Sequence, residues 1–111
     1  MIEKTIIDYL NQELPVAVFL ERPKNPPNKY VIFEKTGSSK LNHLVTATFA
    51  FQSYAPTMLE AAELNEEVKA AVESMTVLDT ICSARLDSDY NFTYTAMKDY
   101  RYQAVFDITH Y

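Results

Sequence analysis

Three side chains have the chemistry of metal ligands or of a nucleophile and its base: His43, Cys82 and His110. All three are expected on strands, in phase with apolar neighbours. A metal site needs converging ligands, and no close pair such as H-x-H is present. Nothing marks Cys82 as lying at a helix N-terminus or in an electropositive pocket, as an activated thiol requires. We therefore expect isolated side chains at the edge of a core, with no metal, cofactor or catalytic residue.

The segment from Asp87 to Asn91 (DSDYN) imitates the opening of a calcium-binding loop. Such a loop needs glycine at its sixth position and a bidentate glutamate at its twelfth. Phe92 and Lys98 stand at these two positions, so the calcium interpretation fails. We predict instead a turn in which Asp and Asn side chains bond to their own backbone.

Seven of the 14 aromatic residues lie from Tyr90 onward. Interleaved aromatics on a sheet can stack single-stranded bases, but this mode also needs a cationic groove. The stretch offers Lys98 and Arg101 against Asp99 and Asp107, with Asp89 directly before it, so stacking of bases is poorly supported. Core packing is sufficient for Tyr100, Tyr102 and Phe106, which share one face of a predicted strand.

A further group of aromatics falls in a predicted connection, where a single subunit has no core to offer. Exposed aromatics and methionine are typical of protein contact surfaces. Two interpretations stay open, an interface or local packing within the loop. The residues concerned are Tyr90, Phe92, Tyr94 and Met97.

One face of a predicted helix carries a row of glutamates against a single lysine, Lys69. Such a row is ordinarily a solvated face. Its one-sidedness admits a second use, because a surface lined with carboxylates repels passing DNA. The row consists of Glu60, Glu63, Glu66, Glu67 and Glu73.

The composition excludes several classes of enzyme. A chain of 111 residues, 48% hydrophobic, fits one domain over residues 1–111. Its single glycine excludes glycine-rich phosphate loops, and its single cysteine excludes a disulfide framework and multi-cysteine metal motifs. The net charge of −5 opposes attraction to nucleic-acid phosphates or anionic lipid. Neither a signal peptide nor a membrane span is expected.

Hydrophobic periodicity predicts the elements that position these residues. The expected helices cover 2–14 and 58–74, and the expected strands cover 16–20, 30–35, 41–53, 77–86 and 100–111. Pro15 ends the first helix, and Thr57 with Glu60 forms a capping box before the second. A hairpin turn is expected over 36–39, around the only glycine. The order α-β-β-β-α-β-β indicates an α+β fold, with two helices on one face of a mainly antiparallel sheet of about five strands.

Three stretches carry a resemblance to a known family. The first is the long alternating strand that runs into a capped, alanine-rich helix, TATFAFQSYAPTMLEAAELNEEVKAAV (46–72). The second is the amphipathic N-terminal helix with its short strand and proline-bearing loop, and the third is the final strand, YRYQAVFDITHY (100–111). In this layout the chain resembles the small tail terminator or tail completion proteins of long-tailed bacteriophages. Other small α+β neck proteins of phages share this order of elements.

The resemblance implies a structural protein of the virion neck, assembled in the bacterial cytoplasm and without catalysis. Its partners would be copies of itself in a ring, usually a hexamer, the tail-tube protein below and the head–tail connector above. Neither specific nucleic-acid binding nor membrane binding is implied. The loops 21–29, with Arg22 and Lys24, and 88–99 would then contact the tube or the connector. The glutamate row would line the channel through which the genome passes.

Two further classes remain as alternatives. One is a small oligonucleotide-binding or regulatory module that uses its aromatic sheet. The other is an enzyme built on His43, Cys82 or His110. Within the favoured class, the sequence does not distinguish a terminator from a connector subunit, and it gives neither the number of subunits nor the strand edges that pair.

Overall fold

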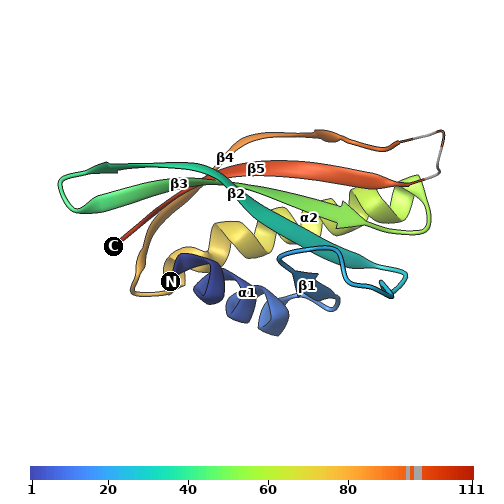
Figure 1. Cartoon of the computed structure of the whole chain (residues 1–111), viewed down its shortest axis with the longest axis horizontal. Helices are drawn as coiled ribbons and strands as arrows, with labels where there is room; N and C mark the ends of the chain where they lie inside the picture. Colours follow the sequence, from blue (N-terminus) through green and yellow to red (C-terminus); the bar gives the residue numbers. More distant parts are fainter. Residues whose placement is uncertain (95, 97–98) are drawn as a thin grey trace.

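The computed structural model describes residues 1–94, 96 and 99–111. Two helices lie on one side of a five-stranded sheet with strand order β1-β2-β3-β5-β4 (Figure 1). The α+β fold predicted from the sequence is confirmed. The elements, in chain order, are α1 (Ile2–Glu13), β1 (Ala17–Phe19), β2 (Tyr30–Leu41), β3 (Leu44–Tyr54), α2 (Met58–Glu73), the short 3-10 helix η1 (Ser74–Val77), β4 (Ile81–Asn91) and β5 (Arg101–His110).

The sheet is antiparallel except at one edge, where β1 runs parallel to β2. Strand β5 lies between β3 and β4, and it pairs with β3 from Val45 opposite His110 to Tyr54 opposite Arg101. Strand β1 covers only Tyr30–Ile32 of β2. The rest of β2 and the first part of β3 form a long hairpin that projects from one end of the molecule (Figure 1).

The core lies between the helices and one face of the sheet. Because side chains alternate along a strand, the odd positions of β3 face the helices. Among them, Phe49 and Phe51 are fully buried. Phe33 stacks on Phe51 with ring centroids 5.5 Å apart, and Phe106 meets Phe51 edge-on at 5.9 Å. The helices cover these rings with apolar residues that are themselves buried: Ile6, Leu10, Leu64, Val68 and Val72.

Both predicted helix boundaries follow from local chemistry. The backbone of Leu14 is already extended (φ −97°, ψ 147°), as expected for the residue before Pro15. At the start of α2, the Thr57 hydroxyl accepts a hydrogen bond of 3.2 Å from the backbone N–H of Glu60. This is the first half of the predicted capping box. The Glu60 carboxylate is directed elsewhere, with Oε1 3.9 Å from Lys29 Nζ.

The prediction of a turn over 36–39 is wrong. Strand β2 continues to Leu41 through a register shift between Lys35 and Gly37, and the chain reverses at Asn42 and His43. Both turn residues have positive φ, 50° and 69°, as a two-residue type I′ turn requires. The glycine misled the prediction, since Asn and His also adopt this conformation more readily than other residues. His43 therefore lies exposed in a turn and not on a strand in phase with apolar neighbours.

The strand predicted over 77–86 is also displaced. Strand β4 runs from Ile81 to Asn91, so the supposed Asp- and Asn-rich turn after residue 87 is strand instead. The physical reason is that β4 is an edge strand, whose pairing with β5 does not require an apolar pattern. Two register shifts, after Ile81 and after Leu86, break its alternation. Cys82 is consequently exposed.

A polar network attaches this edge strand to α2. The Asp89 carboxylate accepts hydrogen bonds from Asn65 Nδ2 at 3.0 Å and Lys69 Nζ at 2.9 Å. The bond to Asp89 raises the pKa of Lys69 above its usual value, which burial only partly opposes. A raised lysine pKa stabilises the fold below the unfolded pKa, and this stabilisation is lost as pH rises through the folded pKa. Asp89 Oδ2 is thus held by both an amide and an ammonium group.

Replacing Asp89 by Asn removes the charge from this network and is expected to lower the free energy of unfolding by roughly 1–2 kcal/mol. Urea denaturation at pH 7 measures the difference. The difference should shrink above the folded pKa of Lys69, where the ammonium is neutral in the parent protein. Asp87→Asn, on the exposed part of the same strand, is the matched control and should change stability by less than about 0.5 kcal/mol.

The position of the hairpin turn is tested by two substitutions with opposite expectations. His43→Val forces a β-branched residue to positive φ and should destabilise the protein by about 1–2 kcal/mol. Gly37→Ala should be neutral or slightly stabilising, because the added Cβ meets nothing within 4 Å and the φ of Gly37 is not positive. Chemical denaturation measures the free energy of unfolding of both variants. A destabilised Gly37→Ala beside an unchanged His43→Val would place the turn at the glycine.

Candidate functional site

The sheet face that the helices leave uncovered carries aromatic and polar side chains near the start of β5. Residues paired in register point to the same face, which places Tyr30 beside Tyr54 and Gln52 beside Gln103. The rings of Tyr30 and Tyr54 are stacked, with centroids 4.6 Å apart and planes at 4°. Burial raises the pKa of Tyr30, although the nearby Arg22 guanidinium works in the opposite direction.

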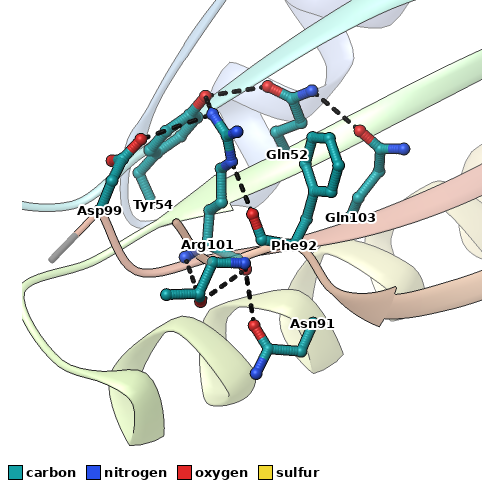
Figure 2. Close-up of polar contacts among 8 residues, drawn as sticks. Gln52, Tyr54, Asn91, Phe92, Asp99, Arg101 and Gln103 are labelled. Atoms are coloured by element: carbon teal, nitrogen blue, oxygen red, sulfur yellow. Dashed lines mark hydrogen bonds and ion pairs between the residues drawn. The ribbon is translucent and has the colours of Figure 1, made fainter. Parts of the chain in front are cut away.

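Arg101 is at the centre of this site (Figure 2). Its Nε donates to the backbone oxygen of Phe92 at 2.9 Å, and its Nη1 donates to the Tyr54 hydroxyl at 3.0 Å. Asp99 Oδ2 lies 3.4 Å from the same Nη1. The guanidinium carbon is 4.5 Å from the centroid of the Phe92 ring and 5.7 Å from that of Tyr54. Arg101 thus joins the end of β4 to β3 and β5.

A chain of hydrogen bonds continues from Arg101 across the sheet. The Tyr54 hydroxyl donates to Gln52 Oε1 at 2.9 Å, and Gln52 Nε2 donates to Gln103 Oε1 at 2.8 Å (Figure 2). Gln103 Nε2 in turn donates to the Tyr90 hydroxyl. The chain links β3, β5 and β4 and satisfies polar groups that are largely removed from water, since Gln103 is only 9% exposed.

The connection between β4 and β5 is also pinned by Thr93. The Thr93 hydroxyl accepts from the backbone N–H of Arg101 at 3.1 Å, and the Thr93 N–H donates to Asn91 Oδ1 at 3.0 Å. Beyond it, Tyr94 and Asp99 exchange two backbone hydrogen bonds of 3.2 Å. The backbone that presents the nearby aromatic rings is therefore well determined by hydrogen bonds.

We call Tyr90, Phe92 and Tyr94 the aromatic patch. Their exposed fractions are 43%, 39% and 58%, which is high for large side chains of this kind. Tyr90 and Phe92 meet edge-on with centroids 5.9 Å apart. An aromatic surface fixed in advance by a polar framework loses little conformational entropy on binding, which favours a protein contact.

The structure brings together several of the residues predicted as an interface. Tyr90 lies in β4 and not in a loop, but it still adjoins Phe92. Arg22 reaches the same site, with its guanidinium carbon 5.8 Å from the Tyr54 centroid. Lys24 is exposed in the loop before β2. Met97 lies outside the described residues.

Sequence reasoning missed the framework beneath the patch: Gln52, Tyr54, Arg101 and Gln103. The sequence does contain a signal for these four residues, since they lie on the polar faces of two strands with alternating polar and apolar residues. Only the pairing of β3 with β5 shows that these faces are adjacent.

The five glutamates of α2 divide into two groups. Glu60, Glu63 and Glu67 line hollows beside Pro15, near the end of α1. Glu66 pairs with Lys69 at 3.1 Å on another side of the helix, and Glu73 is exposed at its end. The single row expected from the sequence is thus two surfaces.

The structure does not assemble the potential metal ligands. His43 lies in the hairpin turn and Cys82 is exposed on β4, while His110 Nδ1 is 3.0 Å from the backbone oxygen of Tyr111. Within residues 1–94, 96 and 99–111, no group of three or more His, Cys, Asp or Glu is arranged to hold a metal ion. In the same part of the chain, every helix is too short or too polar to cross a membrane.

No protein-family model matches the chain, and no curated protein matches it.

The role of Arg101 is tested by replacing it with Lys, which keeps the charge but loses the planar group. We expect the free energy of unfolding to fall by roughly 1–3 kcal/mol, because a lysine ammonium cannot donate to the Phe92 backbone oxygen and the Tyr54 hydroxyl while also lying over the Phe92 ring. Amide hydrogen exchange at Tyr94 should accelerate as the connection loosens. Arg22→Lys is the control, since this exposed side chain makes a single ring contact, and it should alter neither measurement. An Arg101→Lys variant with an unchanged free energy of unfolding and unchanged amide exchange would contradict the proposed framework.

Proposed function

We propose that the protein is a structural subunit of a phage neck, a tail terminator or tail completion protein that caps the tail tube as a ring and joins it to the head connector. The resemblance described above supports this proposal, since the order of elements on which it depends is the order observed. The surfaces of the molecule provide the second line of support.

One observation carries most of the argument: the molecule has two unlike surfaces at its opposite ends. Its extents are 45 × 24 × 24 Å, and the β2–β3 hairpin projects at one end of the long axis while the end of β4 and the start of β5 lie at the other (Figure 1). A ring forms when one surface of a subunit binds a different surface of its neighbour and the rotation closes. Separate ends suit such head-to-tail contacts, and they leave other faces for axial partners.

The aromatic patch is our candidate contact with the tail tube or the connector. Tyr and Phe dominate the energetics of protein interfaces when they are rigid and surrounded by polar groups. The patch meets both conditions through Arg101 and Thr93. We assign the outward glutamates, Glu66 and Glu73, to the channel, where their charge would keep DNA from adhering.

The alternative of an oligonucleotide-binding module receives less support. Such a site needs cations free to contact phosphates beside its stacking rings. Of the two arginines at the site, Arg101 directs its guanidinium to Phe92, Tyr54 and Asp99, and Arg22 has its guanidinium carbon 5.8 Å from the Tyr54 centroid. The aromatic surface therefore suits a protein partner better than a polyanion.

The proposed function is tested by deleting the gene from the phage or prophage that encodes it and measuring tails by electron microscopy. We expect tails of uncontrolled length. Full heads without attached tails would assign the protein to the connector, and normal virions would overturn the proposal.

The patch itself is tested by Tyr94→Ser in co-sedimentation with assembled tail tubes. Loss of a hot-spot aromatic should weaken binding by about tenfold or more while the variant stays folded. Tyr111→Ser is the matched control, because Tyr111 is 75% exposed but lies outside the patch. Equal binding by the two variants would exclude the patch as the contact with the tube.

A further inference from the structure

The end of the β2–β3 hairpin, residues 38–45, is largely exposed at one end of the molecule (Figure 1). It contains Lys40 and His43 but no acidic residue. Leu41, directly before the turn, is 75% exposed. We call residues 38–45 the arm tip. An apolar side chain flanked by basic ones suggests a partner surface with an apolar floor and acidic sides.

Such a surface exists on the helical side of the same molecule. Two hollows of about 530 and 280 Å³ adjoin each other, because Pro15 and Glu67 line both. Leu14, Val16 and Ala70 provide apolar walls, and Glu13, Glu63 and Glu67 provide carboxylates. We call the two hollows the acidic groove. Four glutamates and one lysine line it, so it favours a basic occupant.

The arm tip cannot reach the acidic groove of its own subunit. The hairpin extends beyond the N-terminal end of α1, whereas the groove begins at the C-terminal end of that helix (Figure 1). The paired strands hold the arm straight from Lys35 opposite Phe49 to Leu41 opposite Leu44. An occupant from this chain must therefore come from a second copy.

We propose that the arm tip of one subunit docks in the acidic groove of the next, with Leu41 on the apolar walls and Lys40 among Glu13, Glu63 and Glu67. Charge complementarity and the exposed Leu41 side chain together support this pairing. The chain carries a net charge of −5, so unspecific contacts between copies are repulsive, and the basic arm tip is suited to overcome this repulsion at the groove. The contact joins unlike surfaces, which is the geometry of rings. It deepens the proposed function and rests on it only for the closure of the ring.

The test uses two charge reversals in the full chain, Lys40→Glu and Glu67→Lys, analysed by sedimentation velocity over a range of concentrations. Each variant alone presents like charges at the contact, so its self-association should weaken by about tenfold or more. In an equimolar mixture, the unaltered Lys40 of one variant can dock in the unaltered groove of the other, which restores the parent contact. The mixture should therefore recover association at this contact, although neither variant does so alone. Leu41→Asp tests the apolar part and should also weaken self-association.

Glu73→Lys is the matched control, because it reverses an exposed glutamate of the same helix outside the groove. It should leave self-association unchanged. Circular dichroism melting confirms that each variant is folded.

The inference would be overturned by a parent protein that stays monomeric at the highest concentration, or by single variants that are not rescued by mixing. Rings that persist in both single variants would also reject the arm contact, yet they would leave the neck function standing. Conversely, rescue by mixing together with normal tails after gene deletion would reject the neck function and keep the contact.

Discussion

The structure depends on the fact that helices cover only one face of its sheet. On the covered face, Phe33, Phe49, Phe51 and Phe106 pack against α1 and α2, and this burial is the main favourable term in folding. The other face has no such cover, so its polar groups must find partners along the strands. Thr48 donates to Asp107 Oδ1 at 2.7 Å, and the Thr46 and Thr109 hydroxyls lie 3.0 Å apart. The hydrogen-bonded glutamines and tyrosines around Arg101 satisfy polar groups in the same way towards one end of the sheet. The uncovered face is thus ordered by its own side chains.

How much of this could be predicted depends on the range of the interactions. The helix boundaries were predicted because Pro15 and Thr57 act within a few residues, and the core followed from alternation and helical periodicity. The hairpin turn was misplaced because a lone glycine is a strong local signal, while the real turn is fixed by the register of β2 on β3. The site framework was missed for a related reason. Gln52 and Gln103 are hydrogen-bonded across 51 positions of sequence, and nothing local indicates that β5 inserts beside β3.

In the proposed assembly, as in the fold, positive side chains are paired with carboxylates. Inside the subunit, cations are held by carboxylates: Lys69 by Asp89, Lys35 by Glu3 at 3.3 Å, and Arg101 by Asp99. The arm tip differs, since Lys40 belongs to a segment without acids. Several glutamates near Pro15 likewise face a hollow with only Lys29 among them. The fold thus keeps these opposite charges apart within one chain, and the proposed contact would bring them together.

The central place of β5 also affects how the chain folds as it leaves the ribosome. Strands β3 and β4 emerge first, yet each needs β5 to complete its hydrogen bonds. Until residue 110 has been synthesised, the nascent chain has an unfinished sheet with two open edges beside a row of phenylalanines. Such an intermediate is prone to aggregate, and long-range pairing of this kind slows folding. A cell that makes many copies at once would therefore benefit from chaperones that shield the sheet until the final strand is inserted.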